Sequence, residues 1–300
     1  MLTAKRITAL IFIVATLAFM TFPVMAAELS VKENRTRSGI VNVAVPYISG
    51  SVGGKHIDDM VNQAVLSYVN SQMKQVLSRQ ETEAFESTHP EPRELSEMLH
   101  YNTDLVKYTD KKIVDKNTEG RVTASWHVRN EFEVKAAKDT FYSVVLKTKT
   151  YTGGSGNVVV WKAMNFDLKD GHLMELKELF DAEADYAARL QTLIGYQQKG
   201  RARLIRHIKG KKVPEPGLVV ITGQENFYVD DHYNLGIILY TGTSETIPAD
   251  VDGDTGKTAE AADETVSRDS NQAAVNPQSG TEKIEVFDIS LNDFADLIRL

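Results

Sequence analysis

The sequence predicts an α+β fold, with antiparallel sheets packed by two long helices, a C-terminal helix and a disordered acidic insertion. Apolar residues recur at helical spacing in two long segments, 57–80 and 181–209. Between these segments the period changes to two, which is typical of antiparallel strands with one wet face. The chain has no cysteine, so core burial alone must stabilise it, and this requires real sheets and long helices.

The elements follow in a definite order along the chain. The expected strands are 41–48, 121–134, 141–150, 157–168, 173–176, 217–222, 227–229, 235–240 and 283–287. The expected helices are 57–80, 92–100, 181–209 with Asp181 as N-cap, and a C-terminal helix capped by Ser290 with Asp293 three residues on. In 121–134 the odd positions form the wet face: Arg121, Thr123, Ser125, His127, Arg129, Glu131 and Glu133.

Composition limits the classes of function. The 300 residues are 42% apolar and 25% charged, which indicates a globular chain of about two domains. The 34 basic and 41 acidic residues give a net charge of −7, which argues against a dedicated nucleic-acid binder. Without cysteine, thiol catalysis and Cys-ligated zinc or iron–sulfur sites are excluded.

The N-terminus has the pattern of an export signal over residues 1–27. Two basic residues precede an uncharged stretch, 7–27, that ends in small residues, so cleavage is expected after Ala26 or Ala27. A retained anchor is the alternative, because 21 residues in a helix span about 30 Å. Both interpretations place the body outside the cytoplasm, in the periplasm, in the cell wall or secreted.

Residues 243–281 differ from the rest of the chain. They carry eight acidic and two basic residues and no aromatic residue, which predicts a disordered, low-complexity insertion between the last two strands. Around it, the expected organisation is an N-terminal α+β module, 28–135, and a C-terminal α+β module, 136–300.

The sequence supplies no convincing catalytic or metal site. The seven histidines lie at least eleven residues apart, so no histidine metal motif exists. The acids of 250–254 resemble the start of a calcium loop, but Thr255 and Ala261 stand where Gly and Glu belong. Around Ser155, Asn157 replaces the second glycine of a nucleophile elbow. We therefore expect no catalytic residue, no metal and no cofactor.

Two further charged features leave alternatives open. Adjacent Asp230 and Asp231 suit a solvated turn, or the acid and base of a hydrolase. A run of seven basic residues without an acid suits either a solvated helix end or a docking surface for an acidic wall polymer, a membrane or a partner protein. The run consists of Lys199, Arg201, Arg203, Arg206, Lys209, Lys211 and Lys212.

A motif in the middle of the chain points to a known family. It comprises the loop 151–157 (YTGGSGN), Asn165-Phe166-Asp167-Leu168, Gly171 and the segment 176–180. The motif resembles the extracytoplasmic domain shared by RsiV-type anti-sigma factors and PdaC-type peptidoglycan deacetylases, and 45–50 with the following helix is similar to its N-terminal module. The resemblance covers most of 40–300.

The resemblance implies an α+β fold, an envelope location and, in the anti-sigma members, binding of lysozyme by the outer domain. The chain departs from the family in three ways: Ser155 and Gly156 stand where a His commonly follows the glycines, only six residues precede the apolar segment, and no deacetylase domain follows Leu300.

We therefore expect an exported, non-enzymatic protein that binds a lysozyme-like protein or a wall glycan. It is expected to bind no nucleic acid, and to meet a membrane only through a retained anchor. The expected ligand-binding residues are Tyr151, Thr152, Gly153, Gly154, Ser155 and Asn157. A wall-modifying hydrolase and a structural envelope subunit are the alternatives.

Overall fold

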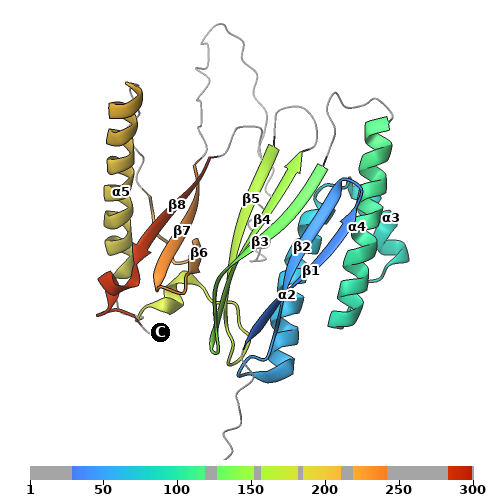
Figure 1. Cartoon of the computed structure of the whole chain (residues 1–300), viewed down its shortest axis with the longest axis horizontal. Helices are drawn as coiled ribbons and strands as arrows, with labels where there is room; N and C mark the ends of the chain where they lie inside the picture. Colours follow the sequence, from blue (N-terminus) through green and yellow to red (C-terminus); the bar gives the residue numbers. More distant parts are fainter. Residues whose placement is uncertain are drawn as a thin grey trace, which may run out of the picture.

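The computed structural model describes residues 29–118, 127–151, 157–181, 185–210, 219–241 and 283–298. Its fold is α+β (Figure 1). The expected export signal and acidic insertion lie outside the described residues. In chain order the elements are β1 (Ser30–Ser38), β2 (Val41–Ser49), α2 (Gly54–Lys74), α3 (Arg79–Thr88), α4 (Leu95–Thr118), β3 (His127–Lys138), β4 (Phe141–Tyr151), β5 (Asn157–Asp167), the 3-10 turn η1 (Leu176–Leu179), α5 (Tyr186–Lys209), β6 (Asn226–Val229), β7 (Asn234–Thr241), β8 (Lys283–Ser290) and the 3-10 turn η2 (Leu291–Phe294).

The larger sheet has five strands in the order β1-β2-β3-β4-β5. Three of its four pairings are antiparallel hairpins, whereas β2 and β3 pair in parallel over only three residues. The parallel pairing is possible because α2, α3 and α4 form the crossover between these strands. The predicted division between residues 135 and 136 falls inside β3.

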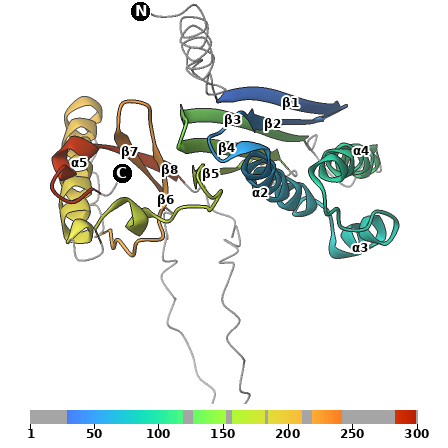
Figure 2. The same cartoon turned by 90° about the horizontal axis from the view of Figure 1, so that it is seen from below.

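Three helices lie on one face of this sheet, as Figure 2 shows from below. Apolar residues of α2 recur at helical spacing and are buried against β2 and β4, with Val61, Val65 and Val69 almost fully buried. Buried Asn62 adds a polar connection: its side chain accepts from the backbone N–H of Ile48 at 2.8 Å and donates to the Ile48 carbonyl at 2.9 Å. These bonds fix α2 on β2.

The smaller sheet, β6-β7-β8, is antiparallel and packs between the larger sheet and α5. Alternate residues of β4 point to opposite sides: Val144 and Leu146 belong to the core under the helices, and Val145 to the cluster between the sheets. On the far side of the smaller sheet, Leu190 and Ile194 of α5 are fully buried. The chain therefore has four layers: helices, large sheet, small sheet and α5.

Several expected elements differ from those observed. The expected helix 57–80 ends earlier than predicted: α2 stops at Lys74, and a separate helix, α3, begins at Arg79, where Ser78 is the N-cap and forms a capping box with Glu81. The expected short helix 92–100 is the start of α4, which continues to Thr118, so the larger sheet has two long helices of its own.

The C-terminal helix was predicted wrongly. The chain makes only the 3-10 turn η2 there, and Ser290 precedes it without a side-chain capping bond. The expected cap at Asp181 also fails, since α5 begins at Tyr186 after Asp185. Residues 173–176 form a single bridge rather than a strand, and the described part of 217–222 contains no strand.

Candidate functional site

The expected binding loop is described only at its two ends. Tyr151 ends β4 and is paired with both Asn157 of β5 and His127 of β3. The rings of Tyr151 and His127 stack with centroids 5.5 Å apart. Thr152, Gly153, Gly154 and Ser155 lie outside the described residues. The structure therefore places only the flanking residues Tyr151 and Asn157, at one end of the larger sheet and beside His127 of β3.

The expected basic patch lies on α5, on the opposite side of the small sheet. Arg203, Arg206 and Lys209 are exposed, whereas Arg201 donates to the Val286 carbonyl of β8 at 2.6 Å. Lys211 and Lys212 lie outside the described residues. The described part of the patch and the described ends of the loop thus lie on different elements, α5 and the larger sheet.

A third surface has more of the features of a site. The face of the larger sheet opposite the helices is covered by the small sheet at β4 and β5, but no described element covers it at β1 and β2. A hollow of about 340 Å³ lies there, which we call the open-face groove. It is lined by Glu33, Arg35, Ala44, Glu131, Phe132, Glu133 and Lys147.

Sheet register explains how the groove forms from distant parts of the sequence. Arg35 of β1 is directly opposite Ala44 of β2, and Glu131 of β3 is opposite Lys147 of β4. Ala44 is small, so the longer side chains on both sides of it stand around a hollow floor. The odd residues of β3 up to Glu133 face this side, as their alternation predicted, and the register shift after Val134 ends this pattern.

Every acidic side chain of the groove is paired with a cation. Glu33 accepts from Arg35, and Glu131 lies 2.5 Å from Arg129. Glu133 forms ion pairs with two lysines: its carboxylate oxygens lie 2.5 Å from Lys135 Nζ and 2.6 Å from Lys147 Nζ. The groove therefore presents charges of both signs at fixed positions.

The ion pairs also set the protonation of the carboxyls. The hydrogen bond from Arg35 holds the pKa of Glu33 below its ordinary value. For Glu133, desolvation acts to raise the pKa, but the hydrogen bonds from Lys135 and Lys147 outweigh it and the net shift is downward. Both groups are therefore carboxylates at neutral pH.

Aromatic rings connect the groove to the small sheet. Lys147 Nζ lies 4.4 Å from the centre of the Trp161 ring, and Lys135 Nζ lies 4.4 Å from that of Tyr228. The Tyr228 hydroxyl donates to Asp288 Oδ1 at 2.7 Å, and burial raises its pKa well above the ordinary value. The groove cation Lys147 is thus held within the larger sheet, and Lys135, which shares Glu133 with it, reaches a ring of the small sheet.

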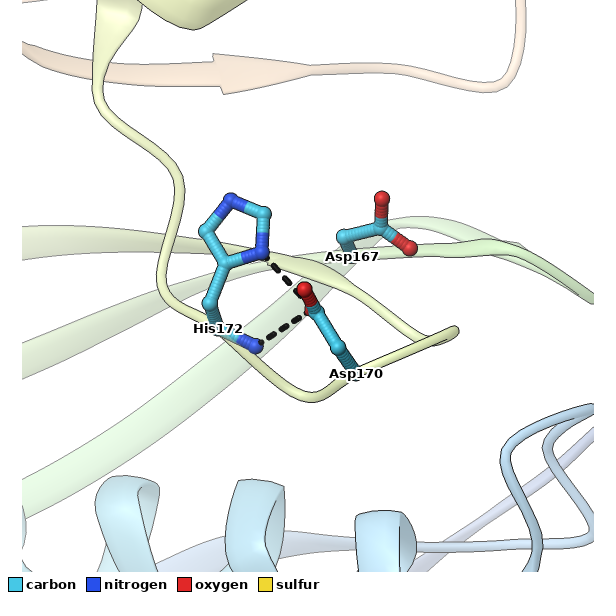
Figure 3. A group of neighbouring side chains, drawn as sticks. All are labelled: Asp167, Asp170 and His172. Atoms are coloured by element: carbon cyan, nitrogen blue, oxygen red, sulfur yellow. Dashed lines mark hydrogen bonds and ion pairs between the residues drawn. The ribbon is translucent and has the colours of Figure 1, made fainter.

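One group of possible metal ligands occurs among the described residues, in the turn after β5 (Figure 3). Asp167, Asp170 and His172 offer ligand atoms within 4.8 Å of one another. His172 Nδ1 lies 2.7 Å from Asp170 Oδ1, and the hydrogen bond raises the pKa of His172 and lowers that of Asp170. Backbone N–H groups of the turn also donate hydrogen bonds to the carboxylates of Asp167 and Asp170. Turn formation accounts for the cluster, which supports no metal assignment.

The candidate acid and base of a hydrolase lie in the β6–β7 turn. Asp230 accepts from the backbone N–H groups of His232 and Asn234, both at 2.8 Å. Desolvation acts to raise its pKa, but these bonds and the one from the Asn234 side chain lower it overall. The Asp231 backbone N–H donates to the Lys135 carbonyl at 3.0 Å. Asp230 thus stabilises the β6–β7 turn.

Sequence reasoning identified Glu131 and Glu133 as wet-face residues but missed three other groove residues, Glu33, Arg35 and Lys147. The strand β1 carries charged or polar side chains at most positions, so no apolar alternation marks it. Its pairing with β2 across the tight turn at Gly39, where φ is +47°, was the available signal.

Comparison with known proteins gives limited information. No protein-family model matches the chain, and no curated protein matches its sequence. Among the described residues, none of the helices is long and apolar enough to cross a membrane.

Two solved structures are similar in outline. One is a member of the DUF3298 family from Bacteroides fragilis, with 13% identity over 70% of this chain and 82% of that chain and a TM-score of 0.43. The other is a DUF3298 family protein from Pseudomonas aeruginosa, with 11% identity over 61% of this chain and 70% of that chain and a TM-score of 0.33. At these TM-scores, neither similarity carries a conclusion about the fold or function of this chain.

Proposed function

We propose that the chain is an exported, non-enzymatic protein of the cell envelope that binds a wall glycan with peptide stems in its open-face groove. The observation that carries the proposal is the groove itself, a hollow of about 340 Å³ in which side chains of both charges surround Ala44. The export pattern of residues 1–27 and the resemblance of the central motif to RsiV-type and PdaC-type proteins support the envelope location.

The charges of the groove favour binding over catalysis. A general acid that works near neutral pH needs a raised pKa, because it must hold its proton until the reaction. In the groove the pKa values of Glu33 and Glu133 are lowered instead. Fixed carboxylates and cations suit recognition of the amines and carboxylates that peptide stems carry.

Co-sedimentation with insoluble peptidoglycan tests the proposal. The full chain is compared with Arg35→Ala and Glu131→Ala, each of which removes one groove charge. Arg79→Ala is the matched control, since Arg79 forms an exposed ion pair with Glu83 on α3, in the helical layer. Thermal melts confirm that all variants are folded.

We expect the wild type and Arg79→Ala to sediment with the glycan equally, and each groove variant to bind about tenfold more weakly, which is about 1.4 kcal/mol. Equal retention of the groove variants, or no retention of the wild type, would overturn the proposal. If the groove binds a lysozyme-like protein and not the glycan, the ligand is a protein and the glycan proposal is wrong.

A further inference from the structure

Helix α5 is longer than the sheet it covers. Leu190 and Ile194 in its first half are buried, and Gln197 and Arg201 then donate to the carbonyls of Asp288 and Val286 in β8. Beyond Arg201 the helix continues past the start of β8 (Figure 1), and Leu204 and Ile208 are 58% and 69% exposed. Two large apolar side chains therefore lie on an uncovered helical segment.

These side chains continue the packing face of the helix. Leu190, Ile194, Arg201, Leu204 and Ile208 are separated by 4, 7, 3 and 4 residues, so they lie along one stripe at 3.6 residues per turn. Leu190 and Ile194 of the stripe are buried, and Arg201 contacts β8 while its own side chain stays exposed. The exposed continuation of the stripe faces the side on which the small sheet lies, beyond the sheet's end.

The same segment is strongly basic. The whole of α5 contains no acidic residue, although the protein has a net charge of −7. No ion pair with another described residue involves any of four cations on its second half: Lys199, Arg203, Arg206 and Lys209. An occupant must therefore be anionic and also supply some apolar surface.

We propose that the segment 201–209 of α5 is a docking surface for an acidic polypeptide, and that its occupant is the acidic segment 243–281 of the same chain. That segment carries eight acidic and two basic residues, together with aliphatic residues such as Ile247 and Val251. Its charge and its apolar side chains both complement the docking surface.

Chain connectivity places the two partners close together. The acidic segment leaves β7 after Thr241 and re-enters at Lys283, and these two residues are paired in the β7–β8 ladder. This is the end of the sheet beyond which α5 continues. Nine helical residues span about 13 Å, whereas a 39-residue segment has a root-mean-square reach of about 35 Å. The tether thus gives a high effective concentration without strain.

Other anionic occupants fit less well. A wall polymer complements the cations but leaves Leu204 and Ile208 exposed. A flat membrane suits a basic apolar helix in general, but here the stripe faces the side of the protein's own sheets, which hinder a planar surface.

Hydrogen exchange of the α5 amides in the full-length chain tests the docking. In one variant the acidic residues of the segment become amides: Glu245→Gln, Asp250→Asn, Asp252→Asn, Asp254→Asn, Glu260→Gln, Asp263→Asn, Glu264→Gln and Asp269→Asn. A second variant, Arg206→Glu with Lys209→Glu, changes the other partner. The control is Glu83→Gln with Glu86→Gln on α3, which removes acids far from α5.

We expect amides in 201–209 to exchange about tenfold faster in both docking variants than in the wild type and the control, because a covered helix end frays less. The difference should fade at 1 M salt, where screening acts within about 3 Å. Equal exchange in the wild type and the amide variant would overturn the proposal. So would protection that depends on protein concentration or requires anionic vesicles, since the partner would then lie outside the chain.

Discussion

The side-chain amide of Asn165 in β5 donates to the backbone carbonyl of Phe227 in β6 at 2.6 Å. Its oxygen accepts from the Ser143 hydroxyl of β4 at 2.7 Å, and Asn165 is 2% exposed. One buried side chain in the large sheet thus satisfies a backbone position of the small sheet. This explains physically why an asparagine opens the Asn-Phe-Asp-Leu motif.

Replacing Asn165 by Ala should destabilise the protein by about 1–3 kcal/mol, because the Phe227 carbonyl and the Ser143 hydroxyl lose a buried partner. Urea unfolding measures the change. Asn34→Ala is the control, since Asn34 is an exposed strand asparagine of β1. If both variants unfold at the wild-type urea concentration, the bond contributes nothing to the joining of the sheets.

Gly236 of β7 is directly opposite Tyr228 of β6, and an added Cβ would overlap the tyrosine ring. Gly236→Ala should therefore displace the ring from Lys135 and Asp288 and cost about 1–3 kcal/mol by overpacking. In the Tyr228→Ala background the same substitution should cost much less, because the ring is gone. A double-mutant cycle measures this coupling, and additive effects would show that ring displacement is not the cause.

Asp110 of α4 holds the turn between β1 and β2. Its carboxylate accepts from the Ile40 backbone N–H at 2.9 Å and from the Ser38 hydroxyl at 3.0 Å. Asp110→Ala should increase amide exchange in the β1–β2 turn and weaken ligand retention by the groove, because β1 carries Glu33 and Arg35. Asp104→Ala on the same helix is the control. Unchanged exchange at Ile40 would contradict the inferred role.

Acid should weaken the Glu133 ion pairs. The folded pKa of Glu133 lies below the ordinary 4.5, so its contribution to stability is present above that pH and is lost as pH falls through the folded value. The contribution is small, about 0–1 kcal/mol, because the side chain is 45% exposed. The stability difference between wild type and Glu133→Gln should shrink below pH 4.5. A carboxyl NMR titration of Glu133 with a midpoint at or above 4.5 would contradict this.

Alternation in the sequence predicted the wet face of β3, and the structure confirms it for His127, Arg129, Glu131 and Glu133. The exception is on the other face, where Asn130 interrupts the apolar series. Asn130 is fully buried and donates to the Ala44 carbonyl at 2.7 Å, while its oxygen accepts from Thr148 at 2.8 Å. Local pattern indicates which side of a strand is buried, but not which distant backbone groups need a partner.

The sequence pattern also missed most of α4, because few apolar residues mark its buried side. Beyond the expected end at His100, α4 buries only a narrow stripe that includes Leu105, Val106 and Ile113, with Lys and Asp residues between them. The groove was unpredictable because residues 33, 44, 131 and 147 meet only once the strand order is known. Strand register depends on tertiary structure, and the residue pattern within a single strand does not show which strand it pairs with.

The short parallel contact between β2 and β3 has a consequence for how the protein folds. Hairpins β1–β2, β3–β4 and β4–β5 close locally, whereas Val43 and its partner Asn130 are 87 positions apart in the sequence. Long-range closure of this kind slows folding, because loop entropy is lost before contacts compensate for it. Joining the N-terminal half to the C-terminal meander is thus expected to be the late, rate-limiting event. The open-face groove spans this seam, so it would be the last part of the molecule to form during refolding.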